Sequence, residues 1–487
     1  MPSQTKVSNG NQESDRSIDA EKESFVLVES VFRDYDIRGI AFEEITPEFA
    51  RRLGCAIGQL IIARDVNTLF VARDGRLSSD ALSESLCLGL VSSGCQVIDL
   101  GVTSTPVLNF AIHNEGSACS GVMVTASHNP GIYNGFKIIL ERQIISKRYL
   151  ENLKVNIKAN NFAKKVHGSL KHINVNLRYL EFIANKSQIK KSFKIVIDGG
   201  NSVSGPLAVA LFQQLNCSVE AIFCDINGHF PHHEPNPSDE KNLTSLIAKV
   251  KQSKADLGLA FDGDGDRVVV ISDTGEIIWP DRLMMIFVKA LLVNKPGARV
   301  VFDIKSSMRL EQLIVERGGV PIQSKTGHSH IRRAVHESNA LIGGEFSGHI
   351  FFNDRWQGFD DGIYAAVRLM EILCENNTQA TRHLSDLVSG FIPTSYTPEI
   401  LIPIAEKDKF AFIQRLTDNA EFAGATINTL DGLRVNFDHG WGLVRASNTT
   451  PNLTLRFEAE NDYFLRSIQQ QFCEELRPFI NNLEDYL

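Results

Sequence analysis

The 487-residue sequence predicts an α/β protein with three related α/β domains, whose sheets are mixed but mainly parallel, and a smaller α+β C-terminal domain. First, a short β-branched strand, an aspartate and a small polar turn occur three times, each followed by a helix-like segment and a second apolar strand. Continuously apolar strands separated by helices are typical of parallel sheets covered on both faces. Second, this pattern stops after about residue 390, where a segment rich in Pro, Thr and Ile begins.

The three repeats occupy residues 69–101, 194–223 and 299–324. The aspartates that mark their turns, about one domain length apart, are Asp74, Asp198 and Asp303. The same order of strand, turn, helix-like segment and second strand in all three repeats indicates that the domains are related. The last part of the chain predicts a helix at 406–420, a hairpin at 430–447 and a strand at 452–459.

Length also requires several domains, because a single core stops growing at roughly 250–300 residues. The first 24 residues are polar and almost free of large apolar side chains, so we expect a disordered tail. The predicted divisions are the tail 1–24, three α/β domains at 25–172, 173–277 and 278–390, and an α+β domain at 391–487.

Composition narrows the possible partners. A net charge of -8 argues against general binding to nucleic acids or membrane surfaces. The eight cysteines show no zinc-binding spacing, and no apolar run approaches the ~20 residues of a membrane span. We therefore expect a cytoplasmic protein with reduced thiols and small-molecule ligands, and a monomer, with an oligomer left open.

The segment LAFDGDGDRVVVI places three carboxylates, Asp262, Asp264 and Asp266, directly after an apolar strand. Like charges so close repel one another, and a divalent cation such as Mg²⁺ or Ca²⁺ would remove that cost. An EF-hand is disfavoured, because its glycine and glutamate positions hold Arg267 and Asp273. A solvated acidic turn is the other alternative. Arg267 suggests that an anion approaches the cation, as in phosphoryl transfer.

A second segment, VMVTASHNP, ends a strand in Ser127 and His128. Ser127 is a candidate nucleophile or phosphoryl carrier, and His128 and Lys137 are candidate acid/base or charge-stabilising partners. A plain Ser/Asn turn stopped by proline remains the alternative. Neither a G-x-S-x-G elbow nor a Walker A motif occurs in the sequence.

Two further segments carry polar groups suited to a sugar phosphate. GGEFSGHIFF offers acceptors and a hydroxyl to vicinal sugar hydroxyls, and VRASNTTPNLTLRFEA offers a guanidinium and small donors to a phosphate. An ordinary strand end and a plain turn are the respective alternatives. Two short segments do not indicate a function by themselves, because both are compatible with surface loops. They are YDIRG, which contains Arg38, and KTGHSH, which contains Lys325 and His328.

Together, DYDIRG, TASHNP, NGFK, AFDGDGDR, KTGHS, GEFSGH, FDDGIY and RASNTTPNLTLRFEA resemble the α-D-phosphohexomutases over roughly residues 30 to 480. Within that family they are most similar to the bacterial bifunctional phosphomannomutase/phosphoglucomutase group. The resemblance implies a heart-shaped enzyme of four domains with one active site in a central cleft.

The resemblance also implies roles for residues. It makes Ser127 a phosphoserine and, with Asp262, Asp264 and Asp266, a ligand of one Mg²⁺ per chain. The implied catalytic residues beside the phosphoryl group are Ser127, His128, Lys137, Arg267 and His328. The implied substrate-binding residues are Tyr35, Arg38, Lys305, Glu345, Ser347, His349, Arg445, Ser447, Asn448 and Thr449.

The implied reaction moves a phosphoryl group between C1 and C6 of mannose or glucose phosphates through a hexose 1,6-bisphosphate, which also acts as activator. Alternatives are a glucosamine-phosphate mutase, a phosphatase on the same scaffold, and a non-catalytic sugar-phosphate sensor. Phe346 stands where methionine is usual in the most similar group, which leaves the sugar preference open. Intact serine and metal loops argue against the sensor.

Overall fold

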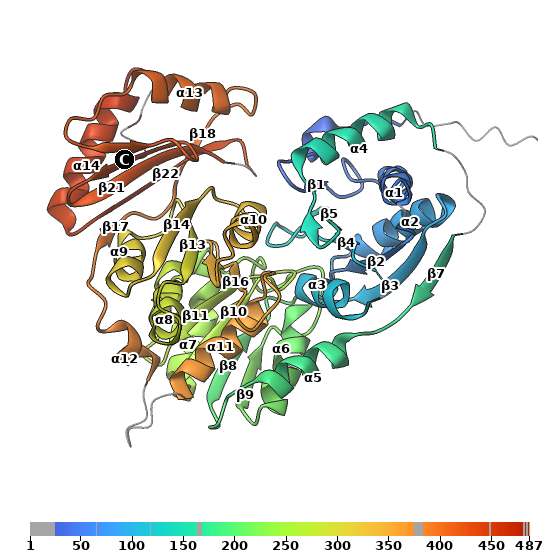
Figure 1. Cartoon of the computed structure of the whole chain (residues 1–487), viewed down its shortest axis with the longest axis horizontal. Helices are drawn as coiled ribbons and strands as arrows, with labels where there is room; N and C mark the ends of the chain where they lie inside the picture. Colours follow the sequence, from blue (N-terminus) through green and yellow to red (C-terminus); the bar gives the residue numbers. More distant parts are fainter. Residues whose placement is uncertain are drawn as a thin grey trace, which may run out of the picture.

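The computed structural model describes residues 25–64, 66–116, 118–162, 168–374, 383–447, 450–480, 483 and 486. The predicted tail, residues 1–24, lies outside these ranges. The described chain forms four sheets, and each sheet with its covering helices is one domain, numbered 1 to 4 in chain order (Figure 1).

Domain 1 is a seven-stranded mixed sheet in the order β1-β5-β4-β2-β3-β7, with β6 paired to β5. The pairs β2–β3, β2–β4 and β3–β7 are parallel, whereas β5 runs antiparallel to β1, β4 and β6. Its strands are β1 (Ile37–Ile40), β2 (Thr68–Arg73), β3 (Gln96–Val102), β4 (Gly121–Val124), β5 (Tyr133–Leu140), β6 (Gln143–Ile144) and β7 (Ser169–His172). Its helices are η1 (Glu29–Val31), α1 (Pro47–Ile62), α2 (Ser79–Ser92), α3 (Thr105–Asn114) and α4 (Lys147–Ala159).

Domain 2 has the strand order β12-β11-β10-β8-β9, in which β8 pairs in parallel with β9 and β10. Its strands are β8 (Lys194–Asp198), β9 (Ser218–Ile222), β10 (Leu257–Phe261), β11 (Val268–Ser272) and β12 (Ile277–Ile278). Its helices are α5 (Asn176–Lys186), α6 (Ser204–Gln214), η2 (Glu240–Leu243) and α7 (Thr244–Ser253).

Domain 3 has the order β14-β13-β15-β16, with β13 parallel to both β14 and β15. Its strands are β13 (Arg299–Asp303), β14 (Val320–Ser324), β15 (Ile342–Gly344) and β16 (Ile350–Phe352). Its helices are α8 (Pro280–Asn294), α9 (Met308–Glu316), α10 (His328–Ser338), α11 (Gly362–Cys374) and α12 (Leu384–Val388).

Domain 4 is an antiparallel sheet in the order β17-β22-β21-β20-β19, with β18 also on β22. Its strands are β17 (Ser395–Tyr396), β18 (Ile400–Pro403), β19 (Thr426–Asn428), β20 (Leu433–Phe437), β21 (Gly440–Ala446) and β22 (Asn452–Ala459). Its helices are α13 (Lys409–Asn419) and α14 (Asp462–Leu476). The predicted hairpin at 430–447 is the β20–β21 pair.

The buried apolar side chains form one large cluster shared by domains 1 to 3 and a separate cluster in domain 4. One apolar cluster runs through domains 1, 2 and 3 and includes Phe70, Phe261 and Phe302. Domain 4 packs around a cluster of its own, which contains Phe457 and Phe472. It meets domain 3 through a small apolar cluster of Ile304, Trp441 and Leu443 and through polar contacts. The first three domains are therefore the more rigid part, and domain 4 is joined to them less tightly.

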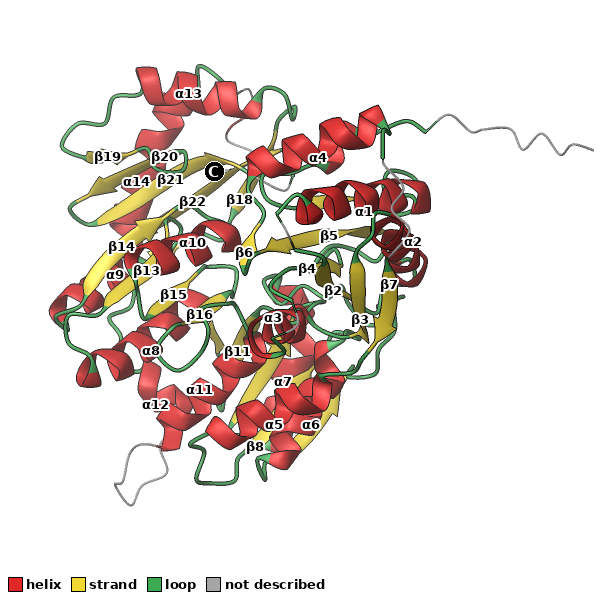
Figure 2. Ribbon diagram, turned by 45° about the vertical axis from the view of Figure 1, so that its right-hand side comes forward, coloured by secondary structure: helices red, strands yellow, loops and turns green. Residues whose placement is uncertain are grey.

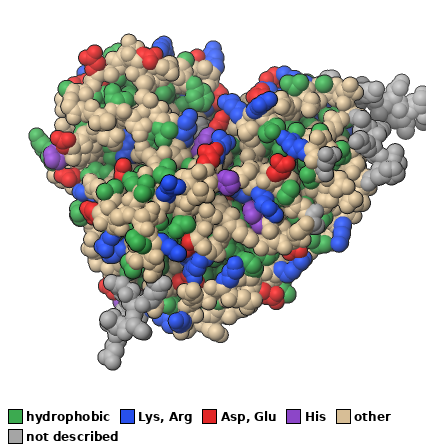
Figure 3. All heavy atoms as spheres, in the orientation of Figure 1, with side chains coloured by type: hydrophobic (Ala, Val, Ile, Leu, Met, Phe, Trp, Pro, Cys, Tyr) green, Lys and Arg blue, Asp and Glu red, His purple; other side chains and the backbone are tan. Residues whose placement is uncertain are grey.

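The predicted fold class is confirmed: three mixed α/β domains precede an α+β domain. The outline is heart-shaped, with a notch between domain 4 and domain 1 (Figure 3), and the turned view in Figure 2 places α10 beside the β5–β6 edge. Among the described residues, helices that are both long and apolar enough to cross a membrane are absent. The predicted domain boundaries at 172, 277 and 390 stay a prediction.

Candidate active site

Ser127 lies in the turn that follows β4, at the meeting point of domains 1 and 2. Its backbone takes a positive φ of 51°, which is uncommon for a residue with a side chain. Its N–H donates to Thr125 Oγ1 at 2.8 Å, and its Oγ donates to Asp262 Oδ2 at 2.8 Å. Ser127 is fully buried. The turn thus holds the hydroxyl against the acidic loop of the next domain, in a conformation that the surroundings must maintain.

Arg76, from the turn after β2, supplies that support, and the sequence prediction did not include it. Its buried guanidinium pairs with Asp74 at 3.1 Å. The same group donates to four backbone carbonyls of the serine turn, those of Ser127, Asn129, Pro130 and Tyr133, at 2.7, 2.6, 2.7 and 3.1 Å. The repeated strand-Asp-turn pattern pointed to Asp74, and the arginine two residues later was the signal that was overlooked.

The acidic loop follows β10 and brings its three carboxylates together. One oxygen each from Asp262, Asp264 and Asp266 lies within 4.8 Å of the others, and all three residues are buried. Lys137 of β5 reaches into the loop, with Nζ 2.6 Å from Asp264 Oδ2 and 2.5 Å from Asp266 Oδ2. Thr105 also donates its hydroxyl to Asp264. Lys137, in the middle of β5, therefore places its amine in the acidic loop.

Burial and mutual repulsion set the charges of this loop. Burial, together with the Asp266 and Asp264 carboxylates, raises the pKa of Asp262 to about 8. Burial also disfavours the charged form of Asp264, but the Lys137 ammonium outweighs it and lowers the pKa of that carboxyl. Burial disfavours the charged form of Lys137, but the Asp264 and Asp266 carboxylates outweigh burial and raise the pKa of the amine above its ordinary value. The amine therefore stays a cation.

The donor set fits a hard divalent cation. The three side chains of the acidic loop are carboxylates, and oxygen ligands are the type that Mg²⁺ prefers. Asp264 Oδ1 and Asp266 Oδ1 are buried and have no hydrogen-bond partner among the described residues. Unpartnered buried carboxylate oxygens are costly, and a cation would satisfy them. The acidic loop can therefore hold a metal ion.

Arg267 and His349 join the acidic loop to the sugar loop of domain 3. Their backbones form an isolated antiparallel bridge, and Arg267 Nε donates to His349 Nε2 at 2.9 Å. Because a guanidinium only donates, Nε2 accepts, which places the ring proton on Nδ1. That nitrogen faces Asp360 Oδ2 at 2.8 Å. Asp360, from the FDDGIY segment, is a second residue that the sequence prediction did not include.

The two other predicted histidines lie in the same buried cluster. His128 Nδ1 is 3.2 Å from Ser127 Oγ, and His328 opens α10 with its ring centroid 5.1 Å from that of His349. Burial and the surrounding cations lower the pKa values of His128 and His328 well below the ordinary value, so both rings are neutral near pH 7. The KTGHSH segment is thus not a surface loop at His328.

Tyr35 and Arg38 line the domain 1 side of the cluster. The Tyr35 ring packs edge-on against His328 with centroids 4.8 Å apart. Arg38, in β1, donates to Asn129 Oδ1 at 2.5 Å and to Asp36 Oδ2 at 2.8 Å. Arg38 therefore contacts the serine turn directly, whereas Tyr35 contacts the start of α10.

The sugar loop connects β15 and β16. Glu345 Oε2 and Ser347 Oγ are buried and lack hydrogen-bond partners among the described residues. Phe346 lies between them in sequence, and its ring is stacked under the Arg456 guanidinium at 3.5 Å. Lys305 pairs with Glu399 at 2.9 Å and so lies at the junction of domains 3 and 4. A polar ligand would supply hydrogen bonds to these two buried oxygens.

The predicted phosphate clamp lies at the end of β21 in domain 4. Arg445 is buried, donates from Nε to Asp431 Oδ2 at 3.0 Å, and has an Nη2 without a partner among the described residues. Asp431 also accepts from the Thr326 N–H of domain 3 at 3.1 Å. Ser447 accepts from the Thr450 N–H at 3.2 Å. Asn448 and Thr449 lie outside the described residues.

Fold and site together define a phosphohexomutase, and comparison with known proteins agrees. Models of the four domains of phosphoglucomutase/phosphomannomutase, I, II, III and C-terminal, match residues 29–164, 177–275, 279–393 and 399–475. The chain belongs to the phosphoglucomutase/phosphomannomutase family, a family of isomerases.

Individual relatives cover nearly the whole chain. The phosphomannomutase/phosphoglucomutase of Pseudomonas aeruginosa is 46% identical over 94% of this chain and 97% of its own. The phosphoglucomutase of Neisseria meningitidis is 42% identical over 92% and 96%. A crystal structure of a family member from Burkholderia thailandensis superposes with a TM-score of 0.88 at 40% identity, covering 94% and 99%. An N-acetylphosphoglucosamine mutase from Aspergillus fumigatus, 14% identical with a TM-score of 0.54 over 92% and 96%, shares the fold.

Proposed function

We propose that this protein is a phosphomannomutase/phosphoglucomutase that moves a phosphoryl group between the 1- and 6-oxygens of mannose and glucose phosphates. The observation that carries the proposal is the buried Ser127 hydroxyl, which donates to Asp262 Oδ2 beside an acidic loop that Lys137 and Arg267 also contact. A serine in such a charged, buried setting is suited to carrying a phosphoryl group. The names of the relatives support the same activity.

Ser127 is the phosphoryl carrier. Phosphorylated Ser127 transfers its phosphoryl group to the free hydroxyl of the bound hexose phosphate, which gives the 1,6-bisphosphate and frees the serine. The bisphosphate then turns within the cleft and returns its other phosphoryl group to Ser127. When bound by Ser127, Asp262, Asp264 and Asp266, Mg²⁺ would neutralise charge on the phosphoryl oxygens.

The surrounding side chains stabilise negative charge, accept a proton and hold one another in position. Lys137 stays a cation and, with Arg267, stabilises negative charge on the transferring group. His328 is neutral and takes the proton of the attacking sugar hydroxyl, and His128 supports the serine oxygen. His349, with its Nδ1 proton facing Asp360, holds Arg267 in place through Nε2.

The far end of the cleft recognises the rest of the substrate. Glu345 accepts hydrogen bonds from sugar hydroxyls, and the Ser347 hydroxyl can donate to them or accept from them. These bonds would satisfy the unpartnered oxygens of both residues. Lys305, Tyr35 and His349 complete this wall. Arg445, Ser447, Asn448 and Thr449 grip the phosphate that is not transferred. Because these clamp residues belong to domain 4, its movement on the other three domains would close the cleft for transfer and open it for release.

Serine replacement tests the carrier directly. We expect Ser127→Ala to abolish conversion of mannose 1-phosphate and glucose 1-phosphate, and Ser389→Ala, an exposed serine after α12, to retain it. Intact-mass measurement should show a phosphorylated fraction in the wild type that the Ser127→Ala protein lacks. Full, bisphosphate-dependent turnover by Ser127→Ala would contradict the proposal.

Substrate assays separate the alternatives. A mutase of the proposed kind converts mannose and glucose phosphates faster than glucosamine 1-phosphate, and releases little inorganic phosphate. Stoichiometric phosphate release would instead identify a phosphatase, and sugar-phosphate binding without turnover would identify a sensor. We further propose that the enzyme acts as a monomer in the cytoplasm; the eight free thiols support the reducing compartment.

A further inference from the structure

A pocket of about 450 Å³ lies outside the proposed active site, between α10 of domain 3 and the β5–β6–α4 segment of domain 1. Figures 1 and 2 both show α10 beside this edge of domain 1. None of the predicted site residues lines it. Its size is within the range of small-molecule sites.

One wall of the pocket is a single face of α10. Ser329, Arg332, Arg333, His336 and Glu337 line it, and their spacing of three and four residues places them on the same side of a helix. The buried apolar side chains Ile331 and Val335 pack on the protein core, and His328, the first residue of the helix, lies beside the pocket face and not on it. The helix therefore has the active site at its first residue and the pocket along one face.

The base of this wall is polar and buried. Ser329 and Arg332 are each only 5% exposed. The Ser329 hydroxyl has no hydrogen-bond partner among the described residues. Arg332 uses two of its five N–H groups to bind domain 1, donating to Asn109 Oδ1 at 2.9 Å and to the Arg142 carbonyl at 2.8 Å. A buried hydroxyl without a partner beside a buried guanidinium indicates a polar ligand.

The other wall adds a third guanidinium and an apolar surface. Arg64 lies over the Tyr149 ring, with its Cζ 4.6 Å from the ring centroid. Leu140 and Ile144 supply apolar contacts, and Glu141, with Glu337 on α10, contributes the two carboxylates of the lining. Three arginines exceed two glutamates, so the lining favours an anion. Arginine and hydroxyl donors together are suited to phosphate oxygens.

We propose that this pocket is a second anion-binding site, separate from the active site, for a small phosphate-bearing ligand. The ligand contacts Ser329, Arg332 and Arg333 on α10 and Arg64 on domain 1. Because it bridges two domains, it stabilises their present arrangement. The same helix ties the domains together through the His330–Asp34 contact at 3.2 Å, so the ligand adds to an existing link.

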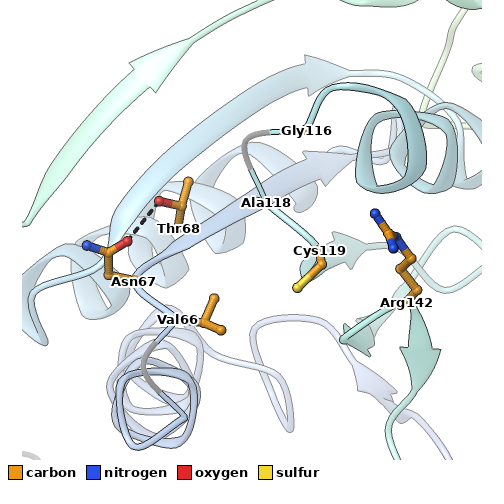
Figure 4. A pocket seen from close by; sticks show the side chains of 7 residues that line it. All are labelled: Val66, Asn67, Thr68, Gly116, Ala118, Cys119 and Arg142. Carbon is orange, nitrogen blue, oxygen red and sulfur yellow. Dashed lines mark hydrogen bonds between the residues drawn. The ribbon is translucent and has the colours of Figure 1, made fainter.

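A smaller pocket on domain 1, of about 300 Å³, offers a contrast. Figure 4 shows Cys119 and Arg142 beside it, with the Thr68 hydroxyl donating to Asn67 Oδ1. It has one cationic side chain in its lining, and its polar groups partly satisfy one another. The α10 pocket is therefore the better anion site.

The test is phosphate binding to the full-length protein by titration calorimetry. We expect two classes of phosphate-binding site in the wild type, the active site and the α10 pocket. Arg333→Gln should weaken one of the two by about tenfold or more, because a charge-assisted hydrogen bond is lost. Arg317→Gln removes the same charge from the exposed end of α9 and should change neither. Glycerol 3-phosphate, in a parallel titration, distinguishes a phosphate ester from free phosphate as the preferred ligand.

Thermal unfolding gives a second readout. Phosphate should raise the melting temperature of the wild type and of Arg317→Gln by more than that of Arg333→Gln or Ser329→Ala, since binding to the folded state stabilises it. A single class of phosphate-binding site, or two classes with equal affinities in the wild type and Arg333→Gln, would overturn the proposal.

Discussion

Replacing Arg76 tests the claim that a buried guanidinium maintains the serine turn. Arg76→Gln removes a cation that serves Asp74 and four backbone carbonyls. Breaking a buried charge pair typically costs about 3–5 kcal/mol, because the remaining groups stay buried without partners. Asp74 keeps hydrogen bonds from Ser79 and Thr125, so the loss falls mainly on the carbonyls of the turn. We therefore place the cost near the lower end of that range.

The turn's displacement should also be visible in catalysis. Ser127 holds a positive φ that the carbonyl contacts help to maintain, so their loss lets the hydroxyl move away from Asp262. A misplacement of about 1 Å can cost roughly 10²-fold in rate. We expect a fall of that size in kcat with a smaller change in KM, since the sugar loop and clamp are untouched.

The assay compares Arg76→Gln and Arg76→Lys with Arg51→Gln. Arg51 pairs with Glu48 on the solvent-facing side of α1, and surface pairs of this kind contribute about 0–1 kcal/mol. Thermal unfolding and mutase kinetics are measured for all three. Arg76→Gln should melt several degrees below the wild type, Arg76→Lys should recover part of the loss, and Arg51→Gln should resemble the wild type. An Arg76→Gln protein with wild-type melting temperature and kcat would refute the reasoning.

Three further outcomes follow from the same structure. Exhaustive EDTA treatment should abolish turnover and added Mg²⁺ should restore it; unchanged activity in EDTA would exclude a metal role for the acidic loop. Phe346→Met should loosen Arg456, which stacks on the ring, and shift the ratio of kcat/KM for mannose and glucose 1-phosphates; an identical ratio would show that Phe346 has no part in specificity. Burial raises the pKa of Asp361 to about 7, so its ionisation destabilises the fold as pH rises from about 4 through 7. The melting temperature of Asp361→Asn, relative to the wild type, should increase between pH 5 and pH 8, and a pH-independent difference would contradict this.

Local patterns were sufficient for much of the site. The alternation of aspartate and glycine after β10 already indicated a cation, because three carboxylates in one short turn need a counter-charge. Ser127 was weaker evidence on its own, since most serine turns are structural. It became a strong candidate only when the acidic, sugar and phosphate loops were considered together. In the described structure its hydroxyl donates to Asp262 Oδ2, and its role as phosphoryl carrier stays a prediction.

Contacts between residues far apart in the chain could not be predicted from sequence patterns. Lys137 is 127 residues before Asp264, and only the pairing of β5 in the domain 1 sheet brings its amine to the acidic loop. Arg76 has Asp74 as its side-chain partner, but its other four partners are backbone carbonyls, which every residue carries, so its contacts with the serine turn leave no mark in the sequence. Asp360 and His349 come from separate segments of domain 3 that a bridge between Phe351 and Asp360 brings together, and Arg267 reaches His349 from domain 2.

The sequence by itself determined the fold class, the order of the domains and the chemical type of each loop, because these depend on local periodicity and on residues adjacent in the chain. The tertiary structure decided which charges meet, which histidines are neutral and which loop conformation is held under strain. These properties depend on burial and on distances between domains, and neither is encoded in any single segment.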